Sequence, residues 1–258
     1  MNKKLIALGV VPLIATIGFA QKQAKPWSEW TKKEAEKVFN DSPWSRAHTE
    51  TESSQAGDVT TNFGDTRGRE ESVRSAGTSA SVTFNVRFFT ARPIRQAYAR
   101  MIQLGETKPD QAVLEKMNAW ANLPADDRII VAVSFDGDQR YVGRVARTFR
   151  GATTADIKNN VYLELNDGKR VLLSEYVPPG KDPFGARFIF PRTVDGQPFL
   201  EANNGTIRFH AEYDPKVPEV AATTGSKSGG GRTETPYKLK LDVKFRLAEM
   251  IQSGELEY

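Results

Sequence analysis

Four arginines recur along one short segment of the chain at intervals of four, three and three residues. They are Arg140, Arg144, Arg147 and Arg150. On an α-helix this spacing forms one stripe, which could dock an anionic envelope polymer, lipid headgroups or an acidic partner protein. The alternative is an ordinary solvated face opposite the apolar residues of the same segment, because arginine is common on exposed helix surfaces. A second arginine group, around a strand-to-helix junction, has the same two interpretations; its members are Arg87, Arg92, Arg95 and Arg100.

One histidine lies close to a carboxylate. His210 and Glu212 alternate with apolar residues and therefore share one face of an expected strand. A histidine–carboxylate pair could transfer protons. An exposed polar pair is the stronger interpretation, because same-face polar neighbours occur on any half-buried strand, and no Gly-x-Ser-x-Gly motif supplies a nucleophile.

Carboxylates offer two further kinds of chemistry. Asp136 and Asp138 flank Gly137 and could bind calcium, but calcium needs six or more oxygens and no EF-hand pattern follows. A turn followed by a helix cap is the simpler interpretation. A glycosidase would need two carboxyl groups roughly 5–10 Å apart across a cleft. The candidate acids are Asp136, Asp138, Glu175, Asp182 and Glu212, and sequence alone assigns no catalytic residue among them.

The chain has four tryptophans, which could line a carbohydrate or peptide groove by stacking. Trp27, Trp30 and Trp120 match the apolar faces of expected helices, so core packing is the stronger interpretation for them. Trp44 follows Pro43 outside any expected helix. We therefore keep Trp44 as a candidate binding residue, with burial as its alternative.

The N-terminal half combines helices with strands. Thr31 and Glu34 have the spacing of a capping box, and Pro43 ends that first helix. Strict alternation predicts a strand over residues 82–88, and two short helices follow it. Residues 128–135 are the most apolar strand. Residues 138–158 fit a helix better than a strand, with Asp138 as its cap, although Gly143 leaves both open.

The C-terminal half is a series of strands. Residues 161–165 and 170–174 flank an Asp-Gly turn, which is typical of a tight hairpin. Further strands are expected over residues 186–191, 206–213 and 237–246, and a short helix over 247–253. The fold class is therefore α+β: mainly an antiparallel sheet or sandwich, with a few helices inserted in the N-terminal half and an N-terminal docking helix.

Residues 1–20 have the features of an export signal. Lys3 and Lys4 precede a short apolar run over residues 5–19, and small residues favour cleavage after Ala20. An uncleaved anchor is the alternative. Residues 21–81 are expected to form the N-terminal helix and a flexible polar loop over 45–81, with an edge strand near residues 59–63. Residues 82–258 are expected to form a single α+β domain with a flexible loop at 219–235.

Composition excludes several classes of protein. The chain has no cysteine and two histidines, which removes zinc-thiolate sites, iron–sulfur clusters and His-rich metal sites. The formal charge of +4 includes two lysines of the leader, and this is not the clustered basic charge of a nucleic-acid-binding protein. No second long apolar run exists, so no transmembrane span is expected after cleavage. We predict no cofactor and no metal.

The opening helix also carries a resemblance. The segment WTKKEAEKVFNDSPW, residues 30–44, resembles a group of uncharacterised exported bacterial proteins of the acidobacterial type. These combine a signal peptide, this tryptophan-flanked helix and an end similar to residues 244–258. Residues 91–98 and 184–191 also share the likeness. No activity is assigned to such proteins, so the resemblance implies export and a shared fold only.

These observations lead to an expected function. We expect an exported protein of the periplasm or the extracellular space that acts as a non-enzymatic binding or structural module. Its partner would be an anionic envelope polymer or another envelope protein. The alternative is a carboxylate-dependent hydrolase acting on an envelope or extracellular polymer. A third possibility is a subunit of a larger assembly, joined through residues 237–246 as an edge strand; the oligomeric state stays open.

Overall fold

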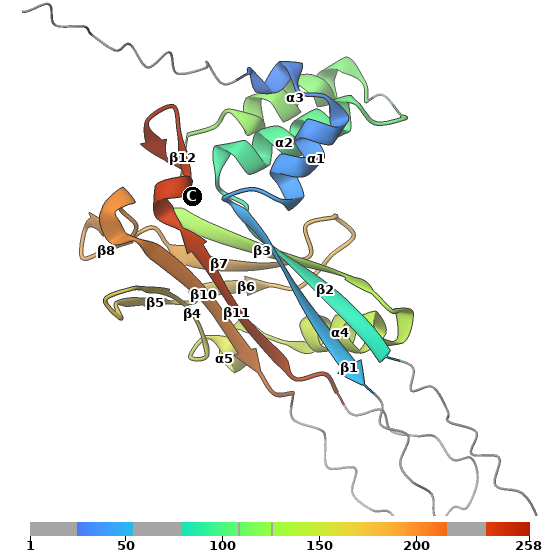
Figure 1. Cartoon of the computed structure of the whole chain (residues 1–258), viewed down its shortest axis with the longest axis vertical. Helices are drawn as coiled ribbons and strands as arrows, with labels where there is room; N and C mark the ends of the chain where they lie inside the picture. The colour runs from blue at the N-terminus through green and yellow to red at the C-terminus, as the bar shows by residue number, and fades with distance from the viewer. Residues whose placement is uncertain (1–24, 54–78, 108, 125, 216–235) are drawn as a thin grey trace, which may run out of the picture.

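The computed structural model describes residues 25–53, 79–107, 109–124, 126–215 and 236–258. The expected leader, the expected edge strand at 59–63 and the expected loop at 219–235 lie outside these ranges. The described chain forms two large antiparallel sheets, two small two-stranded sheets and five α-helices (Figure 1). The expected α+β class is therefore confirmed.

The first sheet has five strands. In spatial order the strands are β1 (Ser45–Ser53), β2 (Ser79–Phe88), β3 (Arg128–Gly137), β7 (Ala186–Pro191) and β6 (Glu175–Val177). In β2, Val82, Phe84, Val86 and Phe88 are fully buried, as the alternation predicted.

The second sheet has four strands from the C-terminal half. Their order is β11 (Leu239–Arg246), β10 (Thr206–Tyr213), β4 (Val161–Leu165) and β5 (Arg170–Leu172). The predicted hairpin joins β4 to β5, and Gly168 in its turn has a positive φ of 84°. Leucine, valine and phenylalanine of β11 alternate with exposed polar residues, so this sheet buries one face only.

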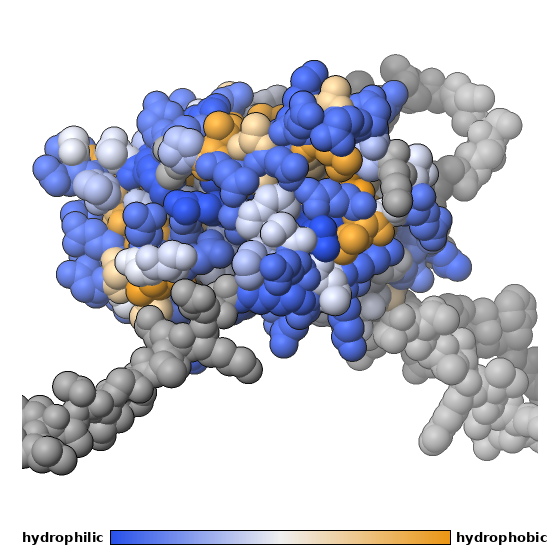
Figure 2. All heavy atoms as spheres, turned by 90° about the horizontal axis from the view of Figure 1, so that it is seen from above, coloured by the Kyte–Doolittle hydropathy of each residue, from blue (hydrophilic) through white to orange (hydrophobic). Residues whose placement is uncertain are grey.

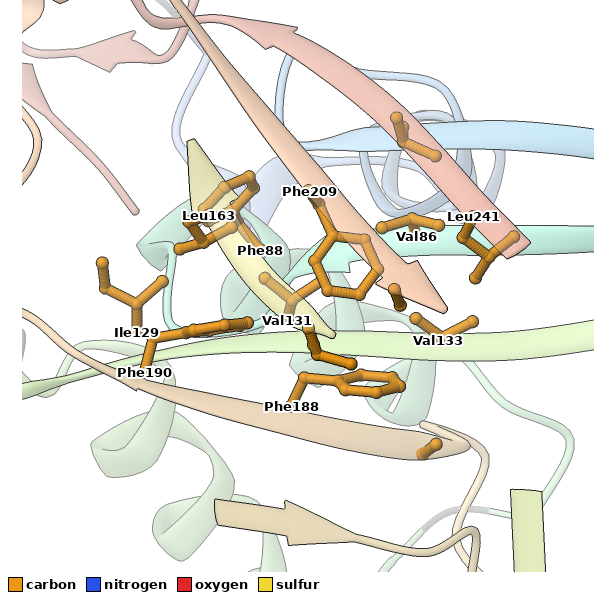
Figure 3. Close-up of a cluster of buried hydrophobic side chains, with 14 of the residues drawn as sticks. Val86, Phe88, Ile129, Val131, Val133, Leu163, Phe188, Phe190, Phe209 and Leu241 are labelled. Carbon is orange, nitrogen blue, oxygen red and sulfur yellow. The ribbon is translucent and has the colours of Figure 1, made fainter. Parts of the chain in front are cut away.

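The buried faces of the two sheets pack against each other and form the core (Figure 3). Phe188 of β7 meets Phe209 of β10 with ring centroids 5.3 Å apart. Phe88 of β2 meets Phe245 of β11 edge to face at 4.9 Å. Such aromatic pairs fix how the two sheets pack on each other, because each ring fills space between side chains of the other sheet.

Three helices cover one end of the sandwich, and we call them the helical unit: α1 (Lys32–Asn40), α2 (Arg92–Gln103) and α3 (Gln111–Ala121) (Figure 1). A short 3-10 helix, Trp27–Glu29, packs on α2. The capping box of α1 is confirmed: the Thr31 hydroxyl accepts from the Glu34 amide, and the Glu34 carboxylate accepts from the Thr31 amide. The capping box thus places the start of α1 at the predicted position.

Two more helices follow β3. They are α4 (Gln139–Gly151) and α5 (Thr154–Ile157), so the helical interpretation of residues 138–158 is confirmed for most of the segment. Asp138 caps α4, because its carboxylate accepts from the Arg140 amide at 3.0 Å. Figure 1 places α4 at the end of the sandwich opposite to the helical unit.

Two expectations about local structure were wrong. The polar segment 45–53 was expected to be a loop, but it is the edge strand β1, paired with β2 along its whole length. An edge strand needs few apolar side chains because backbone bonds to its neighbour hold it, helped here by the Thr49–Thr83 hydroxyl contact of 2.9 Å. The expected closing helix is instead a 3-10 turn, Leu247–Glu249, and a small hairpin of β12 (Ile251–Gln252) and β13 (Glu255–Leu256).

The remaining elements are short connections between the sheets. They are β8 (Thr193–Val194), β9 (Gln197–Pro198) and the 3-10 turn Ala202–Asn204. Beyond them the chain ends against the core: Tyr258 is buried, and its ring lies 3.8 Å from the Arg192 guanidinium. The last residues therefore belong to the packed body.

Candidate functional site

The inner side of α4 anchors the helix firmly. Tyr141, Val145 and Phe149 are buried in the core. The ring centroid of Phe149 lies 5.2 Å from that of Phe135 and 6.3 Å from that of Phe84. Helix α4 therefore contacts the inner face of the first sheet. These contacts determine which side of the helix faces outward.

The predicted arginine stripe lies on the other side of α4, and we call its four residues the arginine face. Arg140, Arg147 and Arg150 are exposed, while Arg144 is half-buried with its guanidinium 5.7 Å from the Tyr141 ring centre. Arg144 and Arg147 also interact with other groups. Within the described residues, Arg140 and Arg150 form no ion pair. The structure thus brings the predicted residues together on one surface.

The turn before α4 has a structural role. The Asp136 carboxylate accepts from the Asn85 amide at 3.3 Å, and Asp138 caps the helix. Gly137 has a φ of 140°, and a Cβ there would lie 2.3 Å from the Ser81 carbonyl oxygen, so only glycine fits. The turn-and-cap interpretation explains both aspartates. In the described part of the chain, no group of three or more acidic or histidine side chains is placed to hold a metal ion.

Trp44 does not belong to this surface, and its candidacy as a binding residue is corrected. It is only 9% exposed and packs in the core. Its indole N–H donates to the Glu257 carbonyl oxygen at 2.8 Å, which ties the C-terminal segment to the start of β1. The sequence could not show this partner because it lies more than two hundred residues away along the chain.

Two members of the second arginine group, Arg87 and Arg95, are directed inward, and Arg92 pairs with Glu255 and Glu257. Arg87 is 4% exposed and donates to the Phe39 carbonyl oxygen at 2.8 Å and to the Ser134 hydroxyl at 2.7 Å. Burial lowers the pKa of Arg87 to about 10, with the nearby Asp136 opposing the shift. Arg95 is also buried, and its guanidinium donates to two carbonyl oxygens at the end of α3. Arg87 therefore joins α1 to the sheet, whereas Arg95 joins α2 to the end of α3.

A second polar constellation lies on the outer face of the four-stranded sheet. We call it the polar ladder, and its members are Tyr162, Glu164, Arg170, Arg208, His210 and Asp242. Glu164 pairs with both arginines, and Arg208 reaches Asp242 at 3.1 Å. Desolvation raises the pKa of Glu164, but hydrogen bonds from Arg170 and Arg208 outweigh it and lower the pKa. The ladder links four strands in register.

His210 belongs to this ladder, and its closer carboxylate is Asp242. Its Nδ1 lies 3.3 Å from Asp242, whereas its Nε2 lies 3.8 Å from Glu212. The Tyr162 ring stacks on His210 with centroids 4.7 Å apart, and the Arg170 guanidinium lies 4.3 Å from the same ring centre. These partners could not be identified from the sequence alone. The alternation of neighbouring strands was the available signal, but the strand pairing had to be known to use it.

The five candidate acids of a hydrolase are distributed over separate elements. Glu175 is exposed at the start of β6, and Asp182 pairs with Arg187 at 3.5 Å. The crevice between α4, α5 and the sheets is too narrow to admit a water molecule, and none of these acids lines it. Its lining is mostly apolar, and the Tyr176 hydroxyl beside it donates to the Phe149 carbonyl oxygen. This crevice lacks the charged groups that a hydrolytic site requires.

Comparison with known proteins adds no family. No protein-family model matches the chain, and no curated protein or solved structure is significantly similar to it. Among the described residues, no helix has the length and apolar character needed to cross a membrane.

Proposed function

We propose that the protein is an exported, non-enzymatic binding or structural module of the cell envelope, which docks an anionic partner through the arginine face. The observation that carries this proposal is the asymmetry of α4. Its inner side is fixed by buried aromatic contacts, and on its outer side Arg140, Arg147 and Arg150 are exposed. A rigid helix that presents charge in one direction is suited to binding rather than to local stabilisation.

The chemistry of the arginine face favours a polymer with repeated acidic groups. Guanidinium groups bind carboxylate and phosphate oxygens in a bidentate manner. At about 1.5 Å per residue, the stripe from Arg140 to Arg150 is about 15 Å long, which spans several charged repeats of a polymer. Binding of this kind weakens as salt screens the charges.

A matched pair of charge-neutralised variants tests the proposal. Dextran sulfate serves as the anionic polymer and uncharged dextran as its control, with the chain starting at Gln21. Two charges near a polyanion contribute about 2 kcal/mol, so Arg140→Gln/Arg150→Gln should bind roughly tenfold or more weakly. Lys240→Gln/Lys244→Gln removes the same net charge from exposed positions on β11 and should bind nearly as the parent does. Equal losses in both variants would show that only net charge matters.

The hydrolase alternative has no comparable support in the described part of the chain. Its candidate acids either stabilise local structure or lie apart on separate elements. The export step is testable by itself. Mass spectrometry of the protein isolated from a bacterial envelope fraction should give an N-terminus at Gln21, and an intact Met1 in the mature fraction would contradict cleavage.

A further inference from the structure

Four aromatic rings from separate parts of the chain meet between the helical unit and the first sheet. We call them the aromatic cluster; its members are Phe89 after β2, Tyr98 of α2, Trp120 of α3 and Phe184 before β7. Measured between ring centroids, Phe184 lies 4.4 Å from Phe89 and 4.5 Å from Tyr98. The Trp120 ring closes the cycle, at 5.6 Å from Phe89 and 6.0 Å from Tyr98. The four side chains therefore form one contiguous group.

All four rings are half-buried, so the cluster forms part of the protein surface. Trp120 does not belong to the buried core, whereas Trp44 does. Figure 2 views the protein from the end that carries the helical unit and shows apolar side chains at the surface among hydrophilic ones. Aromatic side chains together with a few polar groups line most sites that bind small molecules, so we next consider the polar groups of the cluster.

Two polar groups at the edges of these rings have no hydrogen-bond partner within the described part of the chain. The indole N–H groups of Trp30 and Trp44 both donate to main-chain oxygens, whereas no described residue accepts from the indole N–H of Trp120. The hydroxyl of Tyr98 likewise has no partner among the residues that the structure describes. Neither atom is buried, so both reach the solvent. A ligand on the cluster can therefore accept hydrogen bonds from both groups.

An ion pair lies beside the rings. The Asp182 carboxylate accepts from the Phe184 amide at 3.1 Å and lies 3.5 Å from the Arg187 guanidinium. These two side chains remain 33% and 29% exposed, so the cluster has an acceptor and a further donor at its rim, and their charges offset each other. Burial and, after it, the charge of Asp182 raise the pKa of Tyr98, so its hydroxyl stays protonated and can donate.

We propose that the aromatic cluster binds an uncharged carbohydrate chain. A sugar ring presents apolar C–H groups to an aromatic side chain, while its hydroxyl groups both donate and accept hydrogen bonds. The cluster matches both properties, because Trp120 and Tyr98 supply apolar surface and donors, and the Asp182 carboxylate supplies an acceptor. A proline-rich peptide would use the rings and the donors, but its carbonyl oxygens cannot bond to a carboxylate.

This proposal goes beyond the proposed function, because it concerns a different surface and an uncharged ligand. The aromatic cluster includes side chains of α2 and α3, and Figure 1 places the helical unit at the end of the sandwich opposite to α4. An uncharged ligand also gives a different salt dependence. Its binding to the cluster should change little with ionic strength, whereas binding of a polyanion to the arginine face should weaken.

Calorimetric titration of the full-length protein with chitohexaose, an uncharged oligosaccharide of N-acetylglucosamine, tests the proposal, and cellohexaose serves as a second probe. Trp120→Phe retains an aromatic ring but removes the N–H donor, and Tyr98→Phe removes only the hydroxyl. Each should weaken binding roughly threefold to tenfold, the range expected for one hydrogen bond. Trp30→Phe is the matched control. It removes an indole N–H that already donates to the Lys25 carbonyl oxygen and should bind as the parent does.

NMR locates the bound oligosaccharide independently. Among the indole N–H signals of the four tryptophans, we expect that of Trp120 to shift most on addition of chitohexaose and that of the buried Trp44 not to move. Binding of neither oligosaccharide, or equal losses in Trp120→Phe and Trp30→Phe, would overturn the proposal. Binding of a proline decapeptide but of neither oligosaccharide would also overturn it.

A last variant separates this site from the arginine face. Arg140→Gln/Arg150→Gln should bind chitohexaose as the parent does, even where it loses dextran sulfate. Loss of chitohexaose binding in this variant would place the sugar on the arginine face and overturn the assignment to the aromatic cluster. The two proposals can therefore fail separately.

Discussion

The helices α3 and α4 have similar N-terminal caps but differ in how much of their surface is buried. Each starts with an aspartate cap followed by glutamine: Asp110 accepts from the Val113 amide, and Asp138 accepts from the Arg140 amide. Yet α4 buries four of its residues, including two aromatic rings, whereas α3 buries only Ala121. Local sequence determines where a helix starts, but packing against the rest of the protein determines which of its side chains remain exposed.

We expect the largest effect on stability from a substitution in the buried side of α4, and a much smaller one from a substitution on α3. Phe149→Ala removes a buried ring that contacts several other aromatic rings and should lower the free energy of unfolding by about 3–5 kcal/mol. Val113→Ala, at a 42% exposed position of α3, should cost less than about 1 kcal/mol because little buried area is lost. Urea unfolding followed by circular dichroism measures both. Similar losses would show that α3 is as deeply supported as α4.

The next effect compares an inward arginine with an outward one. Arg95→Met leaves the carbonyl oxygens of Trp120 and Leu123 without their charged donor and should destabilise the protein by about 2–3 kcal/mol. Arg150→Met on the arginine face should change stability by less than about 0.5 kcal/mol. The same unfolding assay applies. A large loss for Arg150→Met would reveal a structural role and weaken its assignment to binding.

The smallest effect concerns the start of α1 and depends on pH. The Thr31 amide, followed by Lys25 and the Thr31 hydroxyl, lowers the pKa of Glu34 to about 2. Because the folded-state pKa lies below the ordinary value, the carboxylate stabilises the fold above about pH 4.5, and this contribution is lost as the pH falls toward 2.

Titration of the Glu34 carboxyl carbon by NMR should therefore give a midpoint near 2. In stability curves against pH, Glu34→Gln should lie below the parent at neutral pH and converge with it near pH 2. A midpoint at the ordinary value for glutamate would mean that the capping box does not persist in solution.

What could be predicted from the sequence was mainly local. The capping residues Thr31 and Asp138 and the Asp-Gly turn marked element boundaries correctly, because their hydrogen bonds join residues only a few positions apart. The arginine face followed from the helix period alone.

Features built from distant residues could not be predicted in the same way. Trp44 meets the C-terminal segment, and His210 meets Asp242 through strand pairing that the sequence does not reveal. The polar strand β1 has too few apolar residues to be recognised as a strand from the sequence. Its structure is stabilised by backbone pairing with β2. The exposure of Val113 on α3 depends on what the rest of the protein leaves uncovered, which no local pattern encodes.

The most direct test of the account is to locate the anionic partner on the protein. The Nε–Hε signals of the arginines, assigned by NMR in the chain starting at Gln21, are followed while dextran sulfate is added. We predict that the signals of Arg140 and Arg150 shift most, while those of the buried Arg87 and Arg95 do not move. Shifts confined to Arg170 and Arg208 of the polar ladder, or no shift on α4, would contradict the assignment of binding to the arginine face.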